Sequence, residues 1–159
     1  MQSRNNGRRS REPGGSDIFQ QQFSAEAHAV RGALRAAVAR FAPSISDDEA
    51  GALELVLAEV MNNIVEHSYA GGGNGTISLS IVRDRRGLSC SLSDDGVPLP
   101  EGCLARPKLP ETAVLTEHLP EGGFGWYLIH DLTRDLGYRR EGGQNLLAFR
   151  LPLAAPGVG

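Results

Sequence analysis

The sequence contains few of the residues that commit a chain to a disulfide framework, a metal cluster or a membrane. It has 2 cysteines in 159 residues, and Cys90 and Cys103 follow neither metal-ligand nor disulfide-framework spacing. No apolar run approaches the ~18 residues that cross a bilayer. Residues 1–15 carry four arginines, but no apolar segment follows them, which argues against a signal peptide. These absences favour a reduced, cytoplasmic setting.

Lysine is almost missing as well, and this excludes several kinds of nucleotide-binding site. Lys108 is the only lysine, and "GGGNGTIS" lacks the G-x-x-x-x-G-K-[ST] pattern of a P-loop. Lys108 lies among prolines and no His-Arg-Asp loop is present, which excludes the eukaryotic-type protein kinase fold. The strand–G-x-G-x-x-G–helix unit of a dinucleotide fold is absent too. Any bound phosphates would therefore be held by backbone N–H groups, a helix dipole and a metal ion.

The chain length suits one domain with a sizeable core. We expect a disordered basic tail over 1–15, the domain over 16–154 and a C-terminal tail over 155–159. The formal net charge of −3 gives no reason to expect direct binding to nucleic acid or to a membrane.

Hydrophobic periodicity predicts three main helices and four strands. The predicted helices cover 25–41 with Ser24 as N-cap, 47–67 behind a Ser46–Glu49 capping box, and 125–137. The predicted strands cover 17–23, 76–84, 88–94 and 145–153. The long connection between the third strand and the last helix contains at most one short helix, at 112–118, and its length indicates a functional segment. This order predicts an α/β two-layer sandwich, with a mixed, mostly antiparallel sheet and helices packed on one face.

The second predicted helix carries polar residues that a core-facing helix does not need. Glu59 and Asn63 are four residues apart and therefore project from one face. An asparagine carbonyl oxygen suits Mg²⁺, which keeps several waters and bridges phosphates. A carboxylate one turn earlier can accept a proton from an attacking hydroxyl. For the helix taken alone, a solvated polar edge is the simpler interpretation, and it is also the simpler one for Glu66 and His67.

Two glycine clusters flank the long connection. "DDGVP" (94–98) closes one strand, and "GGFG" (122–125) opens the last helix. Glycine beside a helix N-terminus lets backbone N–H groups meet an anion. Each cluster alone is explained by an ordinary turn, but together, at the two ends of one long loop, they predict a nucleotide site.

Taken in order, these motifs resemble the GHKL ATPase superfamily and its Bergerat ATP-binding fold. Glu59–Asn63 followed by His67–Tyr69 resembles its N-box, "DDGVP" resembles its first glycine box and "EGGFGWYLIHDL" its second. The residue pattern of the three motifs is most similar to that of the RsbW-type bacterial anti-sigma factor serine/threonine kinases. The resemblance extends over residues 17–153.

The resemblance implies a role for each matching residue. Asp94 would hydrogen-bond the adenine amino group, and Gly96 would let the backbone pass beside the base. Glu59 would be the catalytic general base, and Asn63 would hold Mg²⁺ between the phosphates. Residues 97–122 would form the lid over ATP. The implied ATP-binding residues are Asn63, His67, Asp94, Gly96, Gly123, Phe124 and Gly125.

Two departures from the family pattern bear on activity. Pro98 stands where the second glycine of the first box usually lies, and Pro120 precedes "EGG". Some relatives carry a basic lid residue that reaches the terminal phosphate. Here the nearest candidates for it are Arg106, Lys108 and His118.

The function that the resemblance implies is that of an anti-sigma factor which is also a protein kinase. It would sequester a sigma factor and use Mg-ATP to phosphorylate a serine or threonine of an anti-anti-sigma (STAS-type) partner, so that the partners exchange. Such relatives act as homodimers. One alternative is a catalytically silent ATP-binding module whose nucleotide state selects the partner. Another is a detached histidine kinase catalytic domain, although no phosphoacceptor helix pair precedes the domain.

Overall fold

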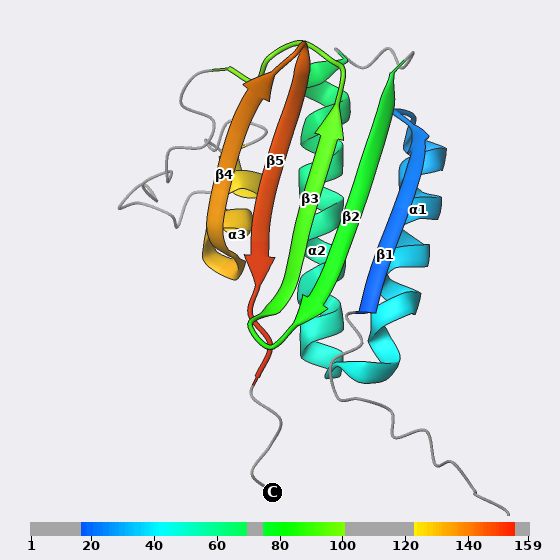
Figure 1. Cartoon of the computed structure of the whole chain (residues 1–159), viewed down its shortest axis with the longest axis vertical. Helices are drawn as coiled ribbons and strands as arrows, with labels where there is room; N and C mark the ends of the chain where they lie inside the picture. Colours follow the sequence, from blue (N-terminus) through cyan, green and yellow to red (C-terminus); the bar gives the residue numbers. More distant parts are fainter. Residues whose placement is uncertain (1–16, 70–74, 101–122, 155–159) are drawn as a thin grey trace, which may run out of the picture.

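The computed structural model describes residues 17–69, 75–100 and 123–154. Its five strands form one sheet in the order β1-β2-β3-β5-β4, and every neighbouring pair is antiparallel. The described α-helices all cover one face of this sheet (Figure 1). The predicted two-layer sandwich is therefore confirmed. The elements are β1 (Asp17–Ser24), α1 (Ala27–Phe41), α2 (Asp47–Asn63), β2 (Thr76–Asp84), β3 (Gly87–Asp94), α3 (Gly123–Leu132), β4 (Arg134–Glu141) and β5 (Gln144–Leu151), with short 3₁₀ and π segments at Ala42–Ser44 and Ile64–Ser68.

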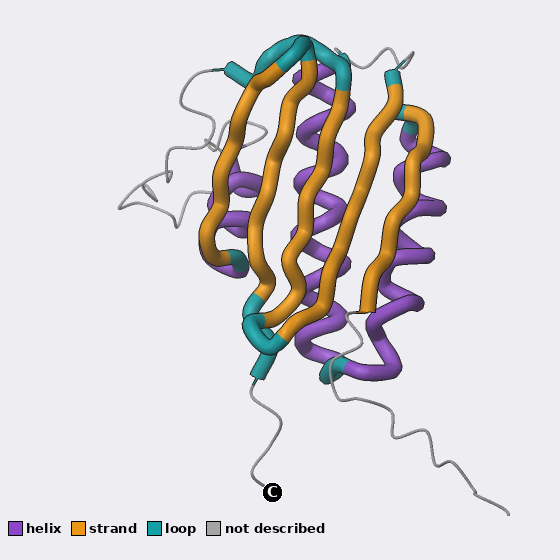
Figure 2. Tube along the Cα trace, in the orientation of Figure 1, coloured by secondary structure: helices purple, strands orange, loops and turns teal. Residues whose placement is uncertain are grey.

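Alternating side chains explain why one face of the sheet carries the helices. In β2, Ile77, Leu79 and Ile81 are fully or almost fully buried, whereas the serines between them are half-exposed. Successive strand residues point to opposite faces, so the apolar set of each strand meets the helices. The helix layer lies behind the strand layer in Figure 2. The core between the layers includes Phe41 and Leu57 from the helices and Leu92 and Phe149 from the sheet.

The sequence predicted the N-terminal cap of α2 correctly and that of α1 incorrectly. The Ser46–Glu49 capping box is confirmed: the Glu49 N–H donates to Ser46 Oγ at 3.1 Å, and the Ser46 N–H donates to Glu49 Oε1 at 2.9 Å. The Ser24 cap is wrong. Ser24 pairs with Thr76 as the last residue of β1, and α1 begins three residues later, at Ala27, where the N-cap residue Glu26 makes no side-chain cap. Sheet pairing therefore takes precedence over capping at this serine.

The prediction of a single helix over 125–137 is also wrong at its end, because residues 134–137 belong to strand β4. α3 ends at Leu132, where the Thr133 hydroxyl donates to the Ile129 carbonyl at 2.5 Å. Asp135 has φ 56°, which a helix does not accommodate. β4 then pairs with β5 through a two-residue loop whose residues, Gly142 and Gly143, have φ values of 60° and 75°. Gly-Gly is a typical type I′ hairpin turn, so the sequence did contain the signal for this strand.

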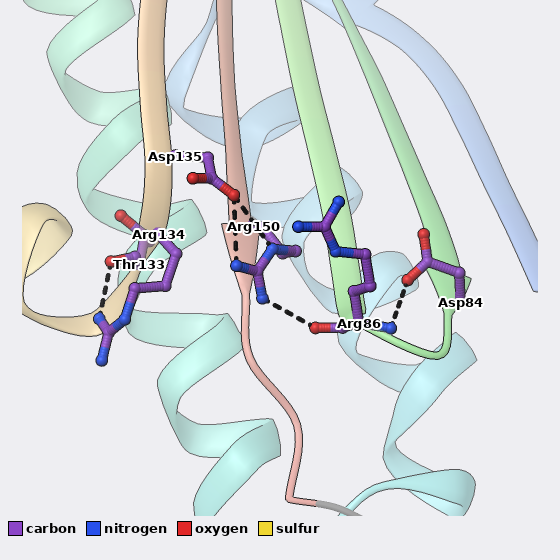
Figure 3. A network of polar contacts seen from close by, with 6 residues as sticks. All are labelled: Asp84, Arg86, Thr133, Arg134, Asp135 and Arg150. Atoms are coloured by element: carbon purple, nitrogen blue, oxygen red, sulfur yellow. Dashed lines mark hydrogen bonds and ion pairs between the residues drawn. The ribbon is translucent and has the colours of Figure 1, made fainter.

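A polar network joins the two hairpins at the end of the sheet opposite the candidate site (Figure 3). Arg150 of β5 donates to Asp135 Oδ2 from two guanidinium nitrogens at 3.2 Å, and to the Arg86 carbonyl at 3.0 Å. The Arg86 N–H in turn donates to Asp84 at 2.7 Å. These bonds fix the β2–β3 turn and the start of β4 against one strand.

The predicted tails at 1–15 and 155–159 and the short helix at 112–118 lie outside the described residues. Within the parts of the chain that are described, no helix has both the length and the apolar character to cross a membrane.

Candidate nucleotide-binding site

Glu59 and Asn63, the pair predicted from helical spacing, lie together against the first turn of α3. A Cβ atom built on Gly125 would be 2.5 Å from Glu59 Oε2 and 3.7 Å from Asn63 Nδ2. The absence of a side chain at Gly125 leaves room for the Glu59 carboxylate beside the first turn of α3. The structure therefore brings three of the predicted residues from two motifs to one place. Their roles toward a ligand stay predictions.

Three buried side-chain polar atoms have no hydrogen-bond partner among the described residues: Asn63 Nδ2, which lies at this contact, and Trp126 Nε1 and His130 Nε2 on α3. Asn63 is 4% exposed and Trp126 is 7% exposed. Unpaired buried polar groups are costly and call for an explanation, such as an absent ligand, ion or water. The α2–α3 contact is therefore a place where a bound ligand can complete the hydrogen bonding.

The continuation of α2 carries the chain from this contact to the second part of the site. Residues Ile64–Ser68 form a π-helical turn, a feature that is frequent at functional sites. Ser68 is buried, and its carbonyl accepts a hydrogen bond from the Val97 N–H at 2.9 Å. The end of the helix is thereby fastened to the chain that leaves β3.

Asp94 and Gly96, the predicted base-binding pair, lie at this second part. Asp94 is 4% exposed at the end of β3, and its Oδ1 accepts from the Gly96 N–H at 3.0 Å. A Cβ on Gly96 would be 2.5 Å from Ser68 Cβ and 2.8 Å from the Ser68 carbonyl carbon. The close approach to Ser68 gives the glycine a structural reason of its own, beside the predicted one of passing along a base.

The two adjacent aspartates of "DDGVP" face different surroundings. Asp95 is exposed, and its carboxylate accepts from the Tyr69 hydroxyl and from the Thr76 N–H. The Tyr69 hydroxyl, and after it the Thr76 N–H, lower the pKa of the Asp95 carboxyl, whereas burial and the bond to Asp95 raise the pKa of Tyr69. Tyr69 and Asp95 therefore link three segments: the end of the π turn, the start of β2 and the residues that follow β3. Asp94 is instead buried, and its contact with a base stays a prediction.

The strongest polar contact of the site was missed by sequence reasoning. Asn145 of β5 is 2% exposed. Its amide N–H groups donate to Asp94 Oδ1 at 2.9 Å and to the Val97 carbonyl at 2.8 Å. Its carbonyl oxygen accepts from the Tyr138 hydroxyl at 2.5 Å and from Arg140 at 3.0 Å. Two of these partners come from β4, a strand that the sequence analysis did not predict, so the signal was lost together with the strand.

The other predicted residues are placed less tightly. His67 is half-exposed within the π turn, and no described hydrogen bond involves it. Gly123 and Phe124 form the start of α3, which is where the sequence expected the phosphates. The proposed lid over 97–122 is described only as far as residue 100, and Arg106, Lys108 and His118 lie outside the described residues.

The residues of the site fit a nucleotide with a magnesium ion. Asn63 offers a hard oxygen ligand of the kind Mg²⁺ accepts together with phosphate oxygens and waters. The described residues hold no cluster of three His, Cys, Asp or Glu side chains that would bind a metal alone. A cleft of about 400 Å³ opens beside Ser68, Gly96 and Arg140. Phosphates at the start of α3 would meet the positive end of its helix dipole.

Comparison with known proteins identifies the class. The family described as "Histidine kinase-like ATPase domain" matches residues 23–151, which is most of the chain. The chain therefore belongs to the histidine kinase-like ATPase domain family, and the GHKL resemblance of its motifs is confirmed.

Individual relatives are more specific. The chain is 32% identical over 102 residues to a protein of Bacillus cereus named "Serine-protein kinase RsbW". It is 31% identical over the same length to proteins of that name from Bacillus thuringiensis and Bacillus mycoides. Each match covers 63% of this chain and 62% of the relative, so the chain spans less than two thirds of the relatives that it resembles.

Proposed function

We propose that the chain is an anti-sigma factor and an ATP-dependent serine/threonine protein kinase. It sequesters a sigma factor and phosphorylates an anti-anti-sigma, STAS-type partner, in a cytoplasmic setting. The observation that carries the proposal is the meeting of Glu59, Asn63 and Gly125 at one helix contact, where the buried Asn63 Nδ2 has no partner among the described residues. The relatives named serine-protein kinases support the choice of a hydroxyl as the phosphoryl acceptor.

In this proposal one part of the site binds the adenine and the other binds the phosphates. Asp94 and the backbone at Gly96 bind the adenine, and the N–H groups at the start of α3, from Gly123 to Gly125, bind phosphates with Phe124 and His67 nearby. Asn63 holds the Mg²⁺, which supplies charge neutralisation at the phosphates when bound. Phosphoryl transfer needs positioning and electrostatic stabilisation above all.

Glu59 is the proposed general base. Glu59 is half-exposed, and its carboxylate lies beside Gly125 at the start of the helix proposed to receive the phosphates. From there it can accept the proton that a serine or threonine hydroxyl loses as its oxygen bonds to the transferred phosphorus. The phosphate adds about 1.5–2 negative charges to the partner. Added charge of this size disrupts a docking surface, which explains the exchange of partners.

The test compares two pairs of neighbouring variants on the same helix. Purified chain is incubated with Mg²⁺, γ-labelled ATP and STAS-domain proteins encoded in the same genome, and phosphoserine and phosphothreonine are measured. Glu59→Ala should lower transfer at least about 10²-fold while ATP still binds, because general-base catalysis contributes roughly 10²–10⁴-fold. Asn63→Ala should weaken ATP binding in the presence of Mg²⁺ and leave Mg²⁺-free binding nearly unchanged.

Matched controls are available nearby, because Glu66 follows Glu59 by seven residues and Asn62 adjoins Asn63. Glu66 and Asn62 are exposed, so Glu66→Ala and Asn62→Ala should behave as the unsubstituted protein. If Glu59→Ala and Asn63→Ala also transfer phosphate normally, the assignment of the site is wrong. A phosphohistidine product would instead favour a histidine kinase catalytic domain.

A second function is favoured by one feature of the sequence. Pro120 and Glu121 stand next to the glycines of the second box, where a basic residue would help to neutralise the terminal phosphate. A catalytically silent module would bind ATP and change partners with the nucleotide, without transfer. Full ATP binding with no phosphorylated partner would support this alternative. A homodimer is part of both proposals, and analytical ultracentrifugation tests it.

A further inference from the structure

We propose that Arg140 and Asn145 form a positioning device that presents one oxygen of Asp94 to the base of the nucleotide. The inference rests on the proposed function, because it assigns the base to Asp94. Neither residue belongs to the motifs that the sequence indicated. Arg140 lies on β4 and Asn145 on β5, directly opposite each other in the sheet.

The hydrogen bonds of Asn145 fix the orientation of its amide. Arg140 is a donor only, so the atom that it contacts at 3.0 Å must be the amide oxygen. A carboxylate and a carbonyl are acceptors only, so the atom that contacts Asp94 and Val97 must be the amide nitrogen. The other possible orientation would lose all of these bonds. Both donors and both lone pairs of the amide are then used, which leaves Asn145 with no capacity to contact a base itself.

The same bonds leave Asp94 with one oxygen for a ligand. Within the described residues, both hydrogen bonds to Asp94, from Asn145 and from the Gly96 N–H, end on Oδ1. A direct arginine–carboxylate pair is often bidentate and would occupy both oxygens. Here an amide separates the guanidinium from the carboxylate. Asp94 Oδ1 thus accepts from an Asn145 amide that Arg140 polarises, and, within the described part of the chain, Asp94 Oδ2 remains free to accept from a ligand.

Arg140 also holds the chain that borders the base. One guanidinium nitrogen donates to the Gly96 carbonyl at 2.8 Å and to Asn145 at 3.0 Å. A single cation therefore fixes the carboxylate through Asn145 and the backbone through Gly96. An acceptor oxygen held in this way recognises an exocyclic amine, as in adenine, and disfavours the oxygen that replaces it in hypoxanthine. Arg140 and Asn145 are positioning residues for this selectivity.

The test measures nucleotide binding by calorimetry, without any protein substrate. Arg140→Met should lower the affinities for ATP and for ADP equally, by about tenfold, because a lost hydrogen bond to a charged group costs on the order of 1.5 kcal/mol and the phosphates are not involved. The affinity for inosine triphosphate, which lacks the amine, should change little, so the preference for ATP over ITP should fall. Arg140→Lys should be intermediate, because an ammonium does not reproduce the planar fork. Arg139→Met is the matched control. Arg139 is the preceding residue, is exposed and, among the residues that the structure describes, pairs only with exposed Glu141, so this variant should bind as the unsubstituted chain does.

The outcomes separate this inference from the proposed function. If the unsubstituted chain binds no ATP, the proposed function is wrong. If it binds ATP and Arg140→Met keeps the same affinity, or weakens ATP and ITP by one common factor, the positioning role is overturned while the proposed function stands. Arg140 is exposed, so the variants should fold, and thermal melting checks this. Should Arg140→Met melt early, the ATP to ITP ratio of Arg140→Lys decides the question.

Discussion

Replacing Gly125 by alanine should separate the catalytic role of Glu59 from the stability of the fold. The new Cβ would lie 2.5 Å from Glu59 Oε2 and 3.5 Å from Glu59 Cδ. The first distance is roughly 1 Å inside the ~3.5 Å at which non-bonded heavy atoms attract best. Because the clash is with the far end of a flexible side chain, the carboxylate moves away and the backbone does not. Asn63 Nδ2, at 3.7 Å, remains in ordinary contact.

The energetic consequences follow from this geometry. Alanine is favoured over glycine in a helix by up to about 1 kcal/mol, which offsets the cost of moving one side chain. The melting temperature should therefore shift by no more than about 4 °C, since 1 kcal/mol corresponds to roughly 2–4 °C in a domain of this size. A misplacement of about 1 Å can cost 10²-fold in rate. Phosphoryl transfer should accordingly fall by about that factor, while the backbone N–H that meets the phosphate is retained.

Three measurements on Gly125→Ala check this reasoning: scanning fluorimetry for melting, calorimetry for ATP affinity, and the labelled-ATP assay for transfer. Calorimetry is preferred to fluorescence here because the single tryptophan, Trp126, adjoins the substitution. Gly96→Ala is the comparison, because its Cβ would meet the backbone of Ser68 and should cost about 1–3 kcal/mol of stability. Normal transfer by a folded Gly125→Ala protein would refute a catalytic position for Glu59 at this contact.

Two further predictions concern single carboxylates. Asp94→Asn should abolish measurable ATP binding and change the melting temperature little. Asp95→Asn should keep ATP binding and lower the melting temperature, because Asp95 joins Tyr69 to Thr76. The reverse result would exchange the roles of the two residues. The Ser46 N–H, the main cause, lowers the pKa of the Glu49 carboxyl, so its ionised form is stabilised by folding. Glu49→Gln should therefore be slightly less stable than the unsubstituted chain at neutral pH, by an amount that solvent screening keeps small. Urea titrations should show the difference vanish as the pH falls through the lowered pKa, and a difference that grows in acid would contradict the sign.

The fold and one half of the site were predictable because local signals and tertiary structure agree there. The four predicted strands are present to within two residues at each end, because their alternation matches a sheet with one buried face. Glu59 and Asn63 were predictable because helical spacing alone puts them on one face. The ordered motifs assigned Gly125 to the same site, whereas its contact with Glu59 came from the structure.

The other half of the site was lost at one ambiguous segment. Leu128, Leu132 and Leu136 fit a helical stripe at a spacing of four, and this period extended the predicted helix through residues that form β4. The Gly142–Gly143 turn would have indicated a hairpin, but the strand before it is mostly charged and its alternation is weak. Asn145 was recognised only as a strand residue, since its partners come from β4 and from the β3 exit. Contacts of this kind depend on sheet topology, which no local pattern reports.

The π turn at Ile64–Ser68 explains how one helix serves both parts of the site. In an α-helix, five residues rotate by ~500°, so Ser68 would point ~140° away from Asn63. A π turn takes more residues per revolution, because its hydrogen bonds run from i to i+5, and it brings Ser68 back toward the side of Asn63. Asn63 then faces α3, while Ser68 meets Gly96 and Val97. The separation between the residues proposed to bind phosphates and those proposed to bind the base is thus set by the length of one helical turn, and the "NNIVEHSY" segment is under constraint at both of its ends.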